Sequence, residues 1–371
     1  MTTVKGSWEL QDVRDKALAG IWKEYDSSGD PFTMFMWGRN TQGNLGQNNL
    51  TNYSSPVQVT GTTWSRMQSD NYATLANKVD GTLWAWGDNN KGQLGQNESG
   101  STDRSSPVQI PGTTWTRPFA INDNQAGCIK SDNTMWMWGH GEEGTLASNN
   151  RTNYSSPIQV PGSWSLAEDA ANVGMHATKA IKTDETLWAW GANGYGTLGQ
   201  NSRNNYSSPM QIGSATNWNY VARSWGGAFA INTSGELYAW GSNFYGCLGI
   251  NANGADSTAR SSPVQIPGTT WKSAYGGTVN TAGLKTDGTL WTWGSNDSGQ
   301  LGQNNRTQYS SPVQVPGTTW TKAKSMYAGT IAQKSDGTLW VMGYNDYGSL
   351  GQNNRVKYSS PVQIPGTTWD S

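Results

Sequence analysis

Short apolar segments alternate with polar loops along this chain of 371 residues, and the alternation returns about every 50 residues. In one period, Thr82–Gly87 reads TLWAWG and places Trp84 and Trp86 on one face of a strand, with Leu83 and Ala85 on the other. Both faces are apolar, which predicts a strand packed between neighbours. The segments PVQI, TTWTRPFA and AGCIK that follow are short and rich in β-branched or aromatic residues, which predicts three more strands.

Three landmarks mark each period. The first is a Trp-Gly pair, replaced by Met-Gly in the last period, with its glycine at Gly38, Gly87, Gly139, Gly191, Gly241, Gly294 and Gly343. The second is a Ser-Ser-Pro run, which begins at Ser54, Ser105, Ser155, Ser207, Ser261, Ser310 and Ser359. The third is a lone tryptophan after a short turn, at Trp64, Trp115, Trp164, Trp218, Trp271, Trp320 and Trp369. The sequence therefore contains seven units.

Turn chemistry separates the strands within each unit. Ser-Asp-Gly or Thr-Asp-Gly precedes the Trp strand and Pro-Gly-Thr-Thr follows the Pro strand, where glycine supplies positive φ and proline presets the turn. Four short strands in each of seven units predict an all-β fold, a seven-bladed β-propeller of four-stranded blades. We interpret each Ser-Ser-Pro copy as the first strand of a blade, repeated because each blade buries its face on the next.

The tryptophans are predicted to be core residues. Eighteen of the 21 occupy the repeating strand positions, and wedge-shaped blades need large side chains between them. Trp225 differs, because it lies in a turn where other units carry Asn71, Asn124 or Tyr275, and exposure is expected there.

Two parts of the chain follow from this count. Residues 32–371 form the propeller, with its first blade shared between N-terminal and C-terminal strands, and residues 1–31 form an N-terminal helix and linker. The helix is predicted from near-helical spacing of apolar residues within residues 8–24. Its apolar positions, with two tryptophans, are Trp8, Leu10, Val13, Leu18, Ile21 and Trp22. The helix either covers the incomplete blade or attaches the propeller to a larger assembly.

The connections are expected to sort into two faces. The tight turns PGTTW and KxDGTLW are nearly uniform and form a scaffold face, whereas the long loops and the variable short turns share the other face, where recognition is expected. The candidate short-turn residues are Asp70, Asn71, Tyr72, Asp123, Asn124, His176, Trp225, Tyr275 and Tyr327. The candidate long-loop residues are Tyr53, Arg151, Tyr154, Arg203, Tyr206, Arg306, Tyr309, Arg355 and Tyr358. Tyr and Arg are typical of interaction hot spots, although each Tyr can instead pack beside its own Pro and each Arg can cap loop carbonyls.

Composition and missing motifs exclude several classes of function. The charged fraction is 14% and the net charge is −1, which does not support binding to nucleic acid through bulk electrostatics. His140 and His176 are the two histidines and have no zinc-ligand spacing, and Cys128 and Cys247 lie in different units. No catalytic or phosphate-binding motif occurs, so we predict no enzyme activity, no catalytic residues, no metal and no cofactor. The sequence has no run of 18 apolar residues, so no membrane insertion is predicted. The N-terminus also lacks the basic-then-apolar pattern of a secretory signal.

The repeat resembles a known family. WGDNNKGQLGQN (Trp86–Asn97), WGANGYGTLGQN (Trp190–Asn201) and WGSNDSGQLGQN (Trp293–Asn304), each followed by a Pro-Val-Gln-like strand, are similar to the regulator of chromosome condensation repeat. The resemblance implies a seven-bladed propeller, and the activity implied by the family's name is nucleotide exchange on a small GTPase with chromatin attachment. The chain departs from it at Gly141, which replaces the loop Asn, and in having no basic arm.

A second resemblance concerns the N-terminus. Trp8, Leu10, Gly20 and Trp22 form a W-x-L…G-x-W segment similar to one on virion and tail-fibre proteins of tailed phages. Together with low charge and Asn/Ser/Thr/Gly-rich loops, it predicts a structural or binding propeller of a phage virion, such as a tail fibre, adhesin or capsid-surface protein. The expected partners are other virion proteins or a host-surface receptor, protein or glycan. The alternative is an exchange-factor-like or chromatin-associated propeller, soluble in the cytoplasm, that acts on a small GTPase.

Overall fold

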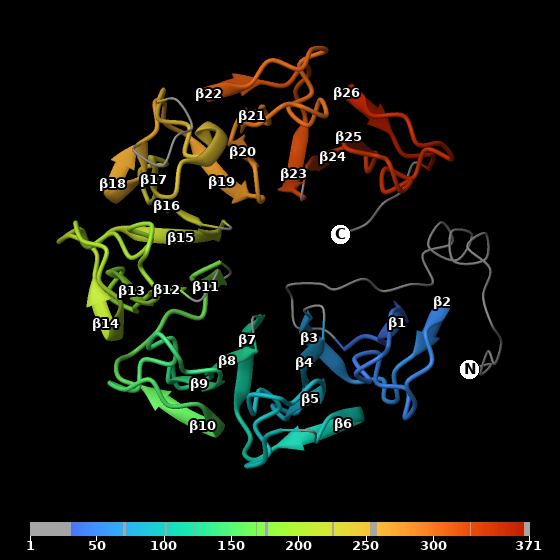
Figure 1. The fold of residues 1–371 in the computed structure, drawn as a ribbon, viewed down its shortest axis with the longest axis vertical. Helices are drawn as coiled ribbons and strands as arrows, with labels where there is room; N and C mark the ends of the chain where they lie inside the picture. The colour runs from blue at the N-terminus through green and yellow to red at the C-terminus, as the bar shows by residue number, and fades with distance from the viewer. Residues whose placement is uncertain are drawn as a thin grey trace. The chain divides into compact units, whose positions relative to one another are not determined.

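The computed structural model describes residues 31–69, 72–100, 102–122, 124–167, 169–174, 177–224, 226–252, 258–326 and 328–366. They form strands β1 to β26 and one 3-10 helix, η1 (Phe244–Gly246) (Figure 1). The chain divides into two compact units, one of Met1–Leu166 with Asp370–Ser371 and one of Ala167–Trp369. The predicted N-terminal helix, with Trp8, Leu10, Val13, Leu18, Ile21 and Trp22, lies outside the described residues.

The first unit contains three antiparallel sheets. One has two described strands, β1 (Phe35–Gly38) and β2 (Tyr53–Gln58). The next consists of β3 (Trp64–Ser69), β4 (Ala73–Lys78), β5 (Leu83–Gly87) and β6 (Arg104–Ile110). The third consists of β7 (Trp115–Asn122), β8 (Gln125–Lys130), β9 (Met135–Gly139) and β10 (Tyr154–Val160).

The second unit contains four antiparallel sheets of four strands each. The first two are β11 (Ala171–Gly174), β12 (Ala177–Ile181), β13 (Leu187–Gly191) and β14 (Tyr206–Gln211), then β15 (Trp218–Arg223), β16 (Gly227–Asn232), β17 (Leu237–Gly241) and β18 (Arg260–Gln265). The other two are β19 (Trp271–Gly276), β20 (Asn280–Lys285), β21 (Leu290–Gly294) and β22 (Tyr309–Gln314), then β23 (Trp320–Ser325), β24 (Gly329–Lys334), β25 (Leu339–Gly343) and β26 (Tyr358–Gln363).

Each four-stranded sheet is a meander that ends on the Ser-Ser-Pro strand. The prediction that Ser-Ser-Pro is the first strand of a blade is therefore wrong, because it is the fourth. The proline explains its place: Pro107 in β6 has no N–H to donate, and an edge strand tolerates that loss. The ladder between β5 and β6 shifts register between Ala85 and Gly87.

The predicted tryptophan core is present in the six four-stranded sheets. In β3 and β5, the rings of Trp64 and Trp86 are both fully buried and lie 5.7 Å apart. The Trp86 indole N–H donates to the carbonyl of Asn44 in the preceding repeat, at 2.9 Å. Trp37 contradicts the core prediction, because its side chain is 57% exposed. Its strand, β1, pairs with β2 alone among the described residues, so a second covering strand is not seen there.

Five of the six tight turns between the second and third strands of the four-stranded sheets share one hydrogen-bond relay. The Asp80 carboxylate accepts from the main-chain N–H and the hydroxyl of Thr82, at 2.9 and 2.6 Å, and the Thr82 hydroxyl accepts from the indole of Trp84 at 2.9 Å. Lys78 Nζ lies 4.1 Å from the centroid of the same indole, a cation–π contact. The relay recurs at Asp132, Asp184, Asp287 and Asp336. The hydroxyl hydrogen bond lowers the pKa of each carboxyl.

Candidate functional site

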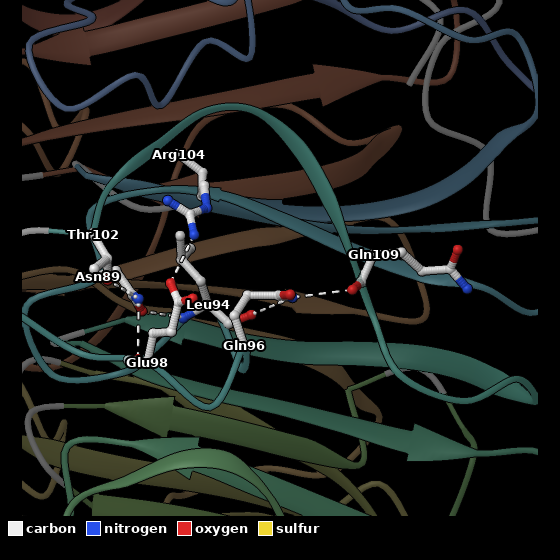
Figure 2. Close-up of polar contacts among 7 residues, drawn as sticks. All are labelled: Asn89, Leu94, Gln96, Glu98, Thr102, Arg104 and Gln109. Atoms are coloured by element: carbon white, nitrogen blue, oxygen red, sulfur yellow. Dashed lines mark hydrogen bonds and ion pairs between the residues drawn. The ribbon is translucent and has the colours of Figure 1, made fainter.

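The long loop between the third and fourth strands is built around one buried asparagine. Figure 2 shows Asn89, whose side-chain oxygen accepts the N–H of Leu94 at 3.0 Å. Its amide donates to the carbonyl of Glu98 at 3.1 Å and to the hydroxyl of Thr102 at 2.7 Å. The same role is played by Asn40, Asn193, Asn243, Asn296 and Asn345. A fully buried amide with all of these partners fixes the loop backbone.

The third sequence repeat has a glycine in place of this asparagine. Gly141 occupies the position, and a Cβ there would lie 1.9 Å from the carbonyl oxygen of Thr152. The loop backbone itself therefore fills the space that the asparagine takes elsewhere.

A glutamine holds the other end of the loop. Gln96 donates its amide to the carbonyls of Leu94 and Gln109, at 3.2 and 3.1 Å, which ties the loop to β6 (Figure 2). Gln47, Gln200, Gln303 and Gln352 make the equivalent pair of bonds. Sequence reasoning did not assign these Asn and Gln side chains a role, although their recurrence in GxNxxGxLGQN is the signal that identifies them.

Each loop is also joined to the Ser-Ser-Pro strand of the next repeat in the same unit. The N–H of Asn304 donates to the carbonyl of Ser359 at 2.7 Å, and Ser360 Oγ donates to the Asn304 side chain at 3.2 Å. Gly299 packs so closely that a Cβ would lie 2.5 Å from the Cα of Ser359. The equivalent main-chain bonds start at Asn48, Asn97, Asn201 and Asn251. The serines thus form the joint between consecutive repeats, and each of these loops is bonded to the repeat that follows it.

Long loops and short turns share one end of five of the described sheets, as expected. The N–H of Asp88, at the start of a long loop, donates to the carbonyl of Tyr72 in the adjacent short turn at 2.9 Å. Ser242 and Gly226 make the same bond at 2.8 Å. Loops and turns together therefore offer one continuous surface at that end of a sheet.

The five loop tyrosines support their own loops. Tyr358 is half-buried, and its hydroxyl accepts the amide of Asn354 at 2.9 Å. Tyr53, Tyr154 and Tyr309 accept from Asn49, Asn150 and Asn305, and the hydroxyl of Tyr206 lies 3.4 Å from that of Ser202. The tyrosine hydroxyls are therefore engaged inside the loops, and only part of each ring faces solvent.

The loop arginines divide into two groups. In the two longer loops, Arg104 pairs with Glu98 at 2.7 Å (Figure 2) and Arg260 donates to the carbonyl of Thr258 at 2.9 Å. In four shorter loops the arginine is exposed and makes no hydrogen bond or ion pair with another described residue; these are Arg151, Arg203, Arg306 and Arg355. We call these four the free loop arginines. They do not cap loop carbonyls, and their guanidinium groups are available to carboxylates or phosphates.

Three of the predicted short-turn residues are described. Tyr72 is 41% exposed and lies beneath Arg39, whose Cζ is 5.8 Å from the ring centroid. Asn124 has a φ of 64° and accepts the amide of Gln93 at 3.0 Å, and Tyr275 packs edge-on against Tyr220 at 6.3 Å. Asp70, Asn71, Asp123, His176, Trp225 and Tyr327 lie outside the described residues.

Burial changes the pKa of several titratable groups among the described residues. Burial and the neighbouring Asp103 raise the pKa of Asp88, which accepts the amides of Asn90 and Gln93. Cys247 is buried, which raises its pKa to about 12, and the pKa of Cys128 is shifted further in the same direction. Within the described ranges, no three His, Cys, Asp or Glu residues are grouped to hold a metal ion. No helix in these ranges is long and apolar enough to cross a membrane.

Two curated relatives share part of their length with this chain. Human E3 ubiquitin-protein ligase HERC2 is 25% identical over 188 residues, which cover 49% of this chain and 4% of HERC2. The ultraviolet-B receptor UVR8 of Arabidopsis thaliana is 25% identical over 284 residues, which cover 72% of this chain and 62% of UVR8. The chain thus spans only a small part of HERC2 and less than two thirds of UVR8.

Two solved structures are similar to this chain along most of their length. Prp20p of Saccharomyces cerevisiae has a TM-score of 0.74 and 18% identity, covering 98% of this chain and 91% of that one. Human WBSCR16 has a TM-score of 0.70 and 18% identity, covering 90% and 94%. These likenesses confirm the predicted fold class, the all-β seven-bladed propeller, with the seven sheets described above as its blades.

Family models match nearly the whole described chain. The model of the RCC1-like domain matches residues 26–330, and the model of the regulator of chromosome condensation (RCC1) repeat matches residues 336–368. The loop motif, the Ser-Ser-Pro joint and the tryptophan core all lie within these matches. Because the first match alone spans more than half of the 371 residues, the chain belongs to the family of RCC1-like domains.

Proposed function

We propose that this chain is a protein-binding propeller whose long-loop face binds an acidic surface of a partner through the free loop arginines. One observation carries the proposal. Arginine recurs at one position of four short loops without a hydrogen-bond or ion-pair partner among the described residues, whereas the arginines of the two longer loops are bonded within their loops. A loop that is already held by internal hydrogen bonds loses little backbone entropy on binding, so the cost is mainly that of ordering the arginine side chains. Arginine is also enriched at the energetic centre of interfaces.

Among partner classes, the comparisons favour a small GTPase. Prp20p is a protein with described binding to Gsp1p and histones, and yeast RCC1 (Prp20) has also been solved in a complex with Kap60. Nucleotide exchange needs no acid, base or metal from the propeller, because a factor that binds the nucleotide-free partner more tightly promotes release by coupling alone. The net charge of −1 gives no support for DNA as the ligand.

The virion role predicted from the sequence gains no support from these comparisons. It rests on the N-terminal segment, which lies outside the described residues, and on loop composition. None of the matched families or relatives named above is described as a virion protein.

A binding assay with matched variants tests the proposal. The wild-type chain is titrated against small GTPases in nucleotide-free, GDP-bound and GTP-bound forms, with release of a fluorescent nucleotide followed in parallel. The triple variant R203A/R306A/R355A should bind at least about tenfold more weakly, since each central arginine contributes on the order of 1 kcal/mol or more. The control K272A removes an exposed positive charge near the tight-turn end of β19 and should bind normally.

Two outcomes would contradict the proposal at different levels. Equal binding by the triple variant and the wild type would show that the arginines are not the interface. Failure of every GTPase form to bind would reject this partner class, and the same variants would then be tested against acidic peptides.

A further inference from the structure

The loop between β25 and β26, drawn in red in Figure 1, exposes two large apolar side chains. The ring of Tyr347 is 86% exposed, the highest value for any large apolar or aromatic side chain among the described residues. Val356, near the other end of the same loop, is 57% exposed. Because both side chains face water, they add little to the stability of the fold, and the free energy of burying them is available to a partner.

Other repeats carry a polar residue at the position of Val356. The backbone there is unchanged: the N–H of Val356 and that of Thr307 each donate to an asparagine side chain, at 2.9 and 2.8 Å. Their carbonyls each accept from a buried asparagine, at 3.0 and 2.9 Å. The valine therefore changes the polarity of the loop surface and not its backbone. The polar residues at this position in loops of the same length are Thr51, Thr152, Asn204 and Thr307.

The exposed tyrosine is positioned by contacts within its own loop. Its ring lies edge-on to that of Tyr344, with the two centroids 6.2 Å apart. Lys357 Nζ lies 4.9 Å from the centroid of Tyr344 and 3.2 Å from a carboxylate oxygen of Asp346. These contacts order the surface before a partner arrives, which lowers the entropic cost of binding.

The charges and hydrogen bonds beside the two apolar side chains indicate which partner fits. Arg355, one of the free loop arginines, and Lys357 supply two positive charges against the one negative charge of Asp346. This balance favours a carboxylate on the partner. The amides of Asn345 and Asn354 are already bonded inside the loop, so they are not available to the hydroxyl groups of a sugar. The arrangement therefore favours a protein segment over a glycan.

We propose that Tyr347, Val356 and Arg355, together called the loop anchor, bind a protein segment in which an apolar side chain is flanked by Asp or Glu. The apolar side chain is buried against the tyrosine ring and the valine, and the carboxylate pairs with the guanidinium. The inference rests on the proposed function, because Arg355 is one of its four arginines. It adds that the acidic surface of the partner carries an exposed apolar residue.

A phage-displayed library of random short peptides tests the loop anchor in the full-length chain. Peptides selected on the wild type should carry an apolar residue next to Asp or Glu. Their synthetic forms should bind Y347A and R355A at least about fivefold more weakly, as expected for the loss of a hot-spot side chain. Y347F keeps the ring and should bind normally. V356T should weaken binding, whereas V79T, the same exchange at an exposed valine in the turn between β4 and β5, should not.

Three results would overturn the proposal: no peptide enriched on the wild type relative to Y347A/V356T, enriched peptides without acidic residues, or equal binding by the wild type and the variants. Neutral oligosaccharides that bind on a glycan array and are lost with Y347A would replace the protein segment by a glycan. A lower unfolding temperature of Y347A or V356T would show that these side chains serve the fold instead. Peptide binding through the loop anchor without binding of any small GTPase would reject that partner class and leave the loop anchor standing.

Discussion

At the scale of single residues, neighbours in one loop have separate roles. Tyr358 accepts a hydrogen bond from Asn354 and is half-buried, while Arg355 between them is exposed and bonded to no described residue. The tyrosine therefore stabilises the loop, whereas the arginine is exposed and can contact a partner. Sequence composition treats both as interface residues, because the pattern of Tyr and Arg does not reveal which group finds an internal partner.

Stability measurements on two variants separate these roles. Tyr358→Phe removes the hydroxyl that Asn354 uses and should lower the free energy of unfolding by about 0.5–1.5 kcal/mol. Arg355→Ala should change it by less than about 0.5 kcal/mol, since the side chain is exposed. Both are measured by denaturant titration. The reverse order of effects would show that the arginine holds the loop.

At the scale of elements, the joint between repeats depends on glycine. In the loop before β22, Gly299 has a φ of +85° and packs against the backbone of Ser359 in the next repeat. The same contact joins Gly43 to Ser105 and Gly246 to Ser310. This explains why the glycine and the Ser-Ser-Pro run recur together: the backbone of the first serine packs where any side chain larger than that of glycine would lie.

A pair of glycine variants tests that joint. Gly299→Ala forces a Cβ to 2.5 Å from Ser359 Cα at a left-handed φ and should cost about 1–3 kcal/mol of stability. Gly194→Ala is the matched control, because no atom lies within 4 Å of its Cβ position and its φ is not left-handed. The control should be neutral or stabilising by up to about 1 kcal/mol. Equal effects, measured as unfolding free energies, would argue against a tight joint.

The strands were predictable and their order was not. Alternating apolar positions and turn residues identify the strand at Leu83–Gly87 and its copies, because burial and turn geometry act locally. The place of Ser-Ser-Pro at the end of a meander depends on which neighbours pair, and a cyclic repeat reads equally well from any starting strand. Likewise, the bonded and free loop arginines differ in both loop length and position: Arg104 directly precedes Ser105 and pairs with Glu98, whereas Arg306 lies four residues before Ser310.

At the scale of the whole molecule, repetition adds small effects. Five tight turns hold an aspartate whose pKa is lowered by a threonine hydrogen bond, in each case below the ordinary value of 3.8. A lowered pKa means that the folded state favours the ionised carboxylate. The stabilisation is therefore complete above the ordinary pKa and is lost as the pH falls through the lowered values.

Thermal unfolding between pH 6 and pH 3 should show this acid sensitivity. The wild-type unfolding temperature should fall at the acid end, and a variant with Asn at Asp80, Asp132, Asp184, Asp287 and Asp336 should fall less. Asp88 acts in the opposite sense, because its pKa is raised in the folded state and its effect on stability becomes less favourable as the pH rises. Asp88 is present in both proteins, so this effect cancels in the comparison. Identical profiles would show that the turn carboxylates do not contribute.

The exposed indole on β1 gives the protein a built-in optical reporter. Trp37 faces solvent at 57% exposure, whereas the other described tryptophans are buried or half-buried. Water around an indole shifts its emission to longer wavelength and admits collisional quenchers such as acrylamide. Among the described tryptophans, Trp37 is therefore the main source of red-edge, quencher-accessible fluorescence, and any molecule that covers this indole will change that signal without an added dye.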